Sequence, residues 1–217
     1  MLTSAIITFF ESLIDDSPDS DYELTLANHV KDVIEGERDW EFLKKIDATK
    51  TWAVSDDYTT AHALPTDFVE PVVLYVGTEY QPYMPIPFEQ RQLYKDSSRR
   101  YYIDYQSKNL YLCGSTSEAK TLYLCYIYQT DDLTTATSPV WLAKFHKLLA
   151  FYMAAVHLGA VDSDDIARVL APNNKIEYLM LRKNMIDHDA RCKAHSINYS
   201  ASDGSIDYSN APNVVDL

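Results

Sequence analysis

The apolar positions of the chain change their spacing twice, from a helical period to a strand period and back. Residues 3–14 place their apolar side chains on one helical stripe, which consists of Ile6, Phe9, Phe10, Leu13 and Ile14. A second helix is expected to start at Ser20, because Ser20 and Glu23 have the spacing of a capping box. Its continuation carries Trp40, so helical structure is predicted for residues 3–46.

The middle of the chain has the two-residue period of β-strands. The strand-like runs are 49–54, 69–76, 101–105, 110–113 and 121–129. The last three follow one another closely and predict an antiparallel meander. Pro71 interrupts the second run early, which places that end of the strand either at a sheet edge or before the ladder begins. Both faces of the run at 121–129 are apolar, which predicts a strand that is central or covered on both sides.

The helical period returns near residue 139. Ser138 and Pro139 predict the start of a long apolar helix that ends at Gly159. Further helices are expected at 163–170 and from Pro172 onward. The inward stripe of the last helix is expected at Ile176, Leu179, Met180 and Ile186.

These patterns predict an α+β fold that is mainly an α-helical bundle. Helical segments at 3–46 and 139–194 are expected to pack together in one domain, 1–194, with a small antiparallel β-meander inserted at 49–130. Residues 195–217 are rich in Ser, Asn and Asp, contain no Lys or Arg, and predict an extended flexible arm. Its isolated apolar residues are Ile197, Tyr199, Ile206, Tyr208, Val214, Val215 and Leu217.

Composition narrows the function classes. With 217 residues and 47% hydrophobic residues the chain has enough apolar material for a core. Its 19 Lys and Arg against 32 Asp and Glu give a net charge of −13. This argues against a protein that neutralises nucleic-acid phosphates or binds anionic membranes. No run reaches the roughly 18 apolar residues of a membrane span, and the N-terminus lacks the basic region of a signal peptide. The three cysteines are expected to be reduced thiols in the cytosol.

Side chains capable of catalysis or metal binding are present, but their placement favours structural roles. The adjacent acidic pairs all lie at element boundaries, where caps and turns need them: Asp15/Asp16, Asp56/Asp57, Asp131/Asp132 and Asp164/Asp165. On a helix, His188, Cys192 and His195 share one side, which is metal-ligand spacing. Arg191 and Lys193 repel a cation there, so a solvated helix end is favoured. We therefore expect no catalytic residue, no cofactor and no metal.

Tyrosine is the one positive compositional signal. Eleven of the 17 tyrosines lie between Tyr75 and Tyr128. Tyrosine is common in strands and also in protein interfaces, because it combines a large apolar area with a hydroxyl group and few rotors. The sequence leaves both readings open: aromatic strand residues alone, or a sheet that contacts a neighbouring protein.

Short motifs then occur in a recognisable order. They are RDWEFL at 38–43, ALPTDF at 63–68, VVLYV at 72–76, YIDY at 102–105, NLYL at 109–112, and LYLCYIY at 122–128 before Asp132 and Leu133. This ordered set resembles the head–tail connector (portal adaptor) proteins of tailed bacteriophages over roughly residues 25–158. The positions that match the family's recurrent motifs are Trp40, Leu64, Pro65, Asp67 and Phe68. The proline- and tyrosine-rich stretch 79–100 is longer than the family leads us to expect.

The resemblance implies a structural protein and not an enzyme. It implies a closed ring of about twelve copies beneath the portal protein, bound below by a tail or neck protein. Such a ring extends the channel, helps to retain the packaged genome, and lets DNA pass without specific binding, since an acidic wall repels phosphate. The expected location is the virion neck, after assembly in the host cytoplasm. The resemblance also assigns portal docking to the C-terminal segment 172–217, with the seven isolated apolar residues of the arm, Ile197 to Leu217, as the expected portal-binding anchors. An adjacent neck stopper or tail-completion protein, a non-ring assembly module and a small hydrolase are the alternatives.

Overall fold

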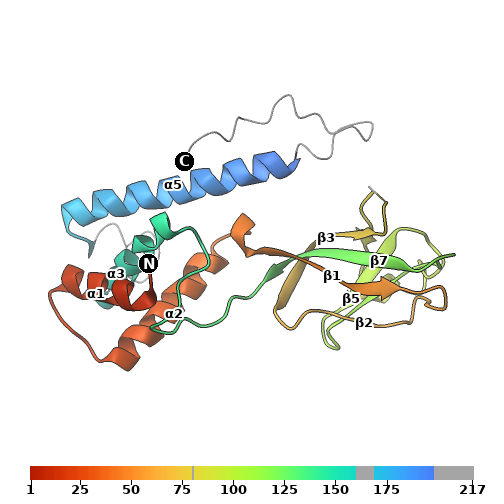
Figure 1. Cartoon of the computed structure of the whole chain (residues 1–217), viewed down its shortest axis with the longest axis horizontal. Coiled ribbons are helices and arrows are strands. Elements are labelled where there is room, and N and C mark those ends of the chain that lie inside the picture. Colours follow the sequence, from red (N-terminus) through yellow and green to blue (C-terminus); the bar gives the residue numbers. More distant parts are fainter. Residues whose placement is uncertain (80, 160–168, 198–217) are drawn as a thin grey trace. The chain divides into compact units, whose positions relative to one another are not determined.

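The computed structural model describes residues 1–79, 81–159 and 169–197, with side chains as far as Lys193 (Figure 1). The chain divides into two compact units. The first, Met1–Phe42 with Asp131–Leu217, is called the helical unit here, and the second, Leu43–Thr130, is called the β unit. The fold is α+β, as expected. It is not mainly helical, because helix accounts for 39% and strand for 22% of the chain.

The helical unit is built around α3 (Lys147–His157), against which α1 (Thr3–Ile14), α2 (Ser20–Gly36) and α5 (Pro172–Ile197) pack. Every residue of α3 from Leu148 to Ala155 is buried, so this helix is central, as is typical of a helix that is apolar on all sides. Phe9 of α1 meets Phe151 edge to face, with ring centroids 5.5 Å apart. Gly159 adopts a φ of 96°, the left-handed conformation that ends the helix.

Two helix starts differ from expectation. The N-cap of α2 is Asp19, whose carboxylate accepts the Asp21 N–H at 2.9 Å, and Ser20 is already helical. The helix expected from Pro139 begins only at Lys147, after a 3₁₀ turn at Ala143–Phe145. Residues 131–142 are non-helical, and other elements satisfy part of their backbone hydrogen bonding. Thr3 N–H donates to Thr137 O at 2.8 Å, and the Asn28 side chain binds both backbone groups of Leu133.

The inward face of α5 also differs from the expected stripe. Tyr178, Met185 and Asp189 are buried. Ile176, Leu179 and Met180 are exposed. Polar contacts explain the difference, because the buried face carries groups that find partners there. Asp189 accepts the Glu41 N–H at 2.7 Å. Arg182 pairs with Glu37, which also accepts a hydrogen bond from the Tyr152 hydroxyl. The helix continues to Ile197, past the expected boundary at 194. Most of the helix expected at 163–170 lies outside the described residues.

The β unit contains a three-stranded and a four-stranded sheet (Figure 1). The first has the order β1 (Lys44–Trp52), β7 (Lys120–Tyr128), β3 (Phe68–Val76). The second has the order β2 (His62–Ala63), β6 (Asn109–Leu112), β5 (Arg100–Asp104), β4 (Met84–Pro85). Their shared core includes Trp52, Leu74, Leu112, Leu122 and Leu124.

The expected meander is only partly present. β5 and β6 form an antiparallel hairpin, but β7 does not pair with β6 and lies between β1 and β3. β7 is thus central, and β3 with Pro71 is an edge strand, in agreement with the alternatives that the sequence left open. The helix expected to continue to residue 46 gives way to a 3₁₀ turn at Glu41–Leu43 and then to β1. The segment 88–95 contains a 3₁₀ turn at Phe88–Gln90 where a short helix was expected.

Candidate functional site

The motif residue Asp67 joins three parts of the β unit. Its Oδ1 accepts a hydrogen bond from the Tyr126 hydroxyl at 2.9 Å, and its Oδ2 accepts one from Lys45 Nζ at 2.8 Å. Its backbone carbonyl accepts the Gln129 N–H at 2.8 Å. Burial on its own raises the pKa of Asp67, but the bonds from Lys45 and Tyr126 outweigh burial and hold the pKa below its ordinary value. Asp67 therefore fastens β1 and β7 to the turn before β3.

The neighbouring motif residues support the same turn. Leu64 N–H donates to Lys108 O at 2.9 Å, and Phe68 N–H donates to Pro65 O at 3.2 Å. The Phe68 ring packs against Tyr126, with centroids 5.7 Å apart. Leu64 and Phe68 thereby border the core between the two sheets. The contacts of the turn at 64–68 therefore stabilise the fold of the β unit.

We expect Asp67→Asn to destabilise the β unit by about 1 kcal/mol at pH 7, since the carboxylate is partly exposed and its ion pair is screened. The folded-state pKa is lowered, so this contribution is present above the unfolded pKa of about 4 and is lost as the pH falls through the folded pKa. Urea unfolding at pH 7 and pH 3 measures it. The difference from the parent chain shrinks at pH 3, and Glu70→Gln is the control for removal of one charge. An Asp67→Asn chain as stable as its parent at pH 7 contradicts this role.

Trp40, the fifth motif residue, lies in the helical unit. It is 1% exposed, and its Nε1–H donates to Ile34 O at 2.7 Å near the end of α2. Its ring stacks on Phe42 at 5.4 Å, and the Arg38 guanidinium lies 5.1 Å from the ring centroid. Trp40 thus closes the C-terminal end of α2. The five motif residues are divided between the two units, and each has packing partners of its own.

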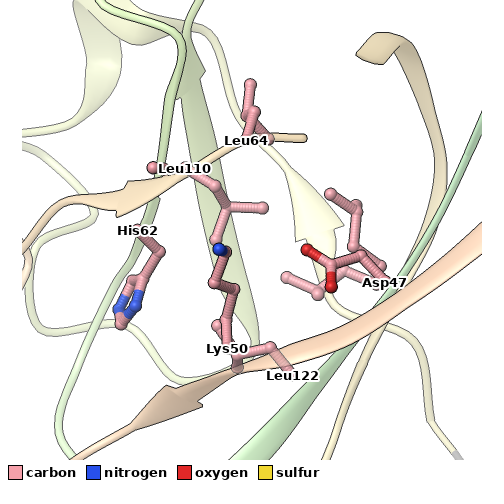
Figure 2. A pocket seen from close by; sticks show the side chains of 9 residues that line it. Asp47, Lys50, His62, Leu64, Leu110 and Leu122 are labelled. Carbon is pink, nitrogen blue, oxygen red and sulfur yellow. The ribbon is translucent and has the colours of Figure 1, made fainter. Parts of the chain in front are cut away.

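A small hollow lies between the two sheets of the β unit (Figure 2). Asp47, Lys50 and His62 enter it beside leucine side chains from both sheets. His62 Nε2 lies 3.8 Å from Asp56 Oδ2, which is too far for a hydrogen bond. Burial lowers the pKa of His62, and Asp56 offsets part of that effect. The hollow has room for about one water molecule, so it is too small for a substrate.

The remaining sequence candidates are only partly described. Cys192 Sγ lies 3.7 Å from His188 Nδ1, whereas the His195 side chain lies outside the described part. Within that part, no three His, Cys, Asp or Glu side chains gather as a metal site would require. Of the proposed portal-binding residues, Ile197 is the last residue of α5, without a described side chain. Tyr199, Ile206, Tyr208, Val214, Val215 and Leu217 lie outside the described residues.

The three-stranded sheet has an apolar face that is partly exposed, which we call the outer sheet face: Ile46, Tyr75 and Tyr123 are exposed, and Val73 and Cys125 are half-buried. The register places Ile46 opposite Cys125 and Cys125 opposite Val73, and in the next row Tyr123 opposite Tyr75. Ile46 is 70% exposed and Tyr123 is 40% exposed. The opposite face carries the buried Leu74, Leu122 and Leu124. A sheet with apolar side chains on both faces is typical of one whose exposed face binds another protein.

Charge is distributed very unequally between the units. The helical unit has 10 Lys and Arg against 22 Asp and Glu, a net charge of −12, whereas the β unit has 9 against 10, a net charge of −1. Nearly all of the chain's net negative charge therefore belongs to the helical unit. In the described part of the chain, every helix is too short or too polar to cross a membrane.

Neither a protein-family model nor a curated protein matches this chain.

Sequence reasoning left a sheet that contacts a neighbouring protein as one of two interpretations of the tyrosines, but it did not identify the residues of the outer sheet face. The signal was present, because the run at 121–129 is apolar on both faces. A central strand covered within the chain gives the same signal, and only the strand order and the exposure of Ile46 and Tyr123 separate the two cases. The face is therefore a property of tertiary structure.

Proposed function

We propose that the chain is a structural head-to-tail adaptor of a tailed phage. It forms a ring beneath the portal protein, extends the DNA channel, joins the capsid vertex to the tail or neck, and helps to retain the packaged genome. The observation that supports this most directly is the outer sheet face. An apolar sheet surface left in water is typical of a protein that completes its burial against neighbours. Side-by-side packing in a closed ring supplies such neighbours.

The charge of the helical unit supports the same proposal. A net charge of −12 repels nucleic-acid phosphate, so a channel bordered by such units gives DNA no points of attachment. The order of the motifs from Trp40 to the strand at 122–128, which resembles that of portal adaptors, also supports the proposal. In this role the virion neck is the location, with the portal above and a tail or neck protein below.

Mixing the purified chain with portal rings tests the adaptor role. Electron microscopy is expected to show an added ring of copies on one end of the portal. A portal that gains no density contradicts the proposal. One bound copy per portal favours the non-ring assembly module in its place.

The arm is expected to carry portal docking. Deleting residues 198–217 retains all of α5, so the circular dichroism spectrum and unfolding midpoint are expected to match the parent chain. Portal binding, measured by co-sedimentation, is expected to fall at least about tenfold, because the deletion removes six of the seven proposed anchors. A matched control exchanges only the polar residues Ser200, Ser202 and Ser205 for alanine and is expected to bind normally. Undiminished binding by the truncated chain rejects the arm's role.

A further inference from the structure

Residues 84–100, the second part of the proline- and tyrosine-rich stretch, form an ordered surface segment. Met84 and Pro85 pair with Arg100 and Tyr101 in a parallel ladder, and Ile86 N–H donates to Tyr101 O at 2.8 Å. Its inner side chains, Ile86 and Tyr94, pack in a small cluster with Tyr102 and Cys113. The segment is thus held at its start, its middle and its end, and needs little ordering before it binds a partner.

Its far end is held against Gly114. Gly114 N–H donates to Lys95 O at 2.7 Å, and its φ is 82°. A Cβ atom at this position would lie 3.3 Å from Ser97 O, so the segment approaches the backbone more closely than most side chains permit. The fold therefore fixes the outward side chains of the segment in place.

These outward side chains combine apolar and basic groups. Leu93 is 76% exposed, the largest exposure among the described large hydrophobic residues, and Met84 and Phe88 are also exposed. Arg91 lies over the Phe88 ring at 4.0 Å, and Lys95 is exposed nearby in sequence. We call these five residues the basic loop surface. Aromatic and arginine side chains around an exposed apolar centre are typical of protein interfaces.

The basic residues of the basic loop surface favour an acidic partner, and the helical unit has an acidic surface. The first 30 residues contain six Asp and Glu and no Lys or Arg. Four of these acidic residues, Asp15, Asp16, Asp19 and Asp21, are exposed at the turn between α1 and α2, which we call the acidic corner. Tyr22, 43% exposed, lies directly after it. The acidic corner therefore offers carboxylates beside an exposed aromatic ring.

We infer that the basic loop surface of one copy docks on the acidic corner of the next copy. The two surfaces lie on different units of one chain and differ in charge, so the contact is heterologous and propagates from copy to copy. The inference rests on the proposed ring and names a second contact between its copies, in addition to the outer sheet face. Duplex DNA is the competing occupant of a basic loop. It is disfavoured here because Glu89 and Asp96 lie in the same segment and the chain carries −13 overall.

The contact is tested by crosslinking two full-length variants, Leu93→Cys and Ser17→Cys, each also carrying Cys125→Ser and Cys192→Ser. The two carry different tags, so a mixed disulfide reports a contact between copies. We expect about tenfold more mixed product than from Leu93→Cys with Ile176→Cys, because Ile176 is also exposed but lies on α5, outside the acidic corner. A yield no greater than this control overturns the inference.

Charge exchange separates a specific contact from chance collision. Arg91→Glu with Lys95→Glu in the Leu93→Cys chain is expected to lower the mixed product about tenfold. Asp16→Lys with Asp21→Lys in the Ser17→Cys chain is expected to restore it. Circular dichroism confirms that each variant is folded. A product unchanged by the reversal, or not restored by the exchange, overturns the inference. The inference is also overturned if the Leu93→Cys and Ser17→Cys chains give no mixed disulfide while the parent chain binds a DNA duplex and Arg91→Glu with Lys95→Glu abolishes that binding.

The same proteins keep the two proposals apart. Rings on the portal without the mixed disulfide reject the loop-to-corner contact and keep the adaptor role. The mixed disulfide without portal binding keeps the contact and rejects the adaptor role. Absence of both rejects both.

Discussion

Replacing Trp40 with alanine is expected to destabilise the helical unit by about 3–5 kcal/mol, the usual cost of removing a large buried aromatic side chain. The indole is 1% exposed, so its removal leaves a cavity whose lining loses packing contacts. The variant also loses the hydrogen bond to Ile34 O at the end of α2, and the Phe42 ring loses its stacking partner. The helical unit is therefore expected to unfold well before the parent chain does.

Urea unfolding followed by helical circular dichroism measures this loss. Trp40→Phe is the matched control: it retains most of the ring packing but not the Nε1–H, so about 1–2 kcal/mol is expected. Trp52→Phe alters a buried tryptophan of the β unit and is expected to leave the helical transition in place. If Trp40→Ala lowers the free energy of unfolding by less than about 1 kcal/mol, the residue does not close α2 in the way described.

Replacing Ile46 and Tyr123 together with lysine is expected to abolish ring assembly on the portal, with affinity between copies falling about 100-fold or more. Both side chains lie on the outer sheet face, and burying two unpaired ammonium groups in an apolar interface is strongly unfavourable. The fold is expected to tolerate the change within about 1 kcal/mol, because both positions already meet water.

Two controls complete that experiment. Ile46→Val with Tyr123→Phe retains the apolar face and is expected to assemble normally. Val54→Lys adds a charge at an exposed apolar residue outside the face and is expected to have no effect on assembly. Electron microscopy of portal mixtures and sedimentation measure the outcome. Normal rings from the double lysine variant show that the outer sheet face does not join the copies.

Local pattern was enough to predict several elements, because their determinants are close in sequence. α1 has the predicted limits, and the edge position of β3 and the central position of β7 agree with the placements that Pro71 and the two apolar faces of 121–129 allowed. The partners of the strands could not be predicted in the same way. Proximity along the chain favoured β6 beside β7, whereas β7 pairs with β1 and β3, about 50 or more residues away. Nothing in a two-residue period specifies such partners.

Buried polar groups account for the other errors. The apolar stripe at Ile176, Leu179 and Met180 predicted one inward face of α5, but a different face is buried. On that face Asp189 accepts the Glu41 N–H and Arg182 pairs with Glu37. Asp67 was recognised only as a motif position. Its role requires Tyr126 and Lys45, which come from other strands. Periodicity reports where apolar side chains recur, and it does not report which polar groups find partners.

The pairing of Lys44 with Ile127 has a consequence for how such a chain can diversify. The polypeptide enters and leaves the β unit on adjacent antiparallel strands, so the two ends of this 43–130 insert emerge side by side. A segment with neighbouring ends can be shortened, exchanged or deleted without rerouting the rest of the backbone. We therefore expect that the β unit can be exchanged as a whole, and that a short connecting loop in its place would keep the helical unit continuous.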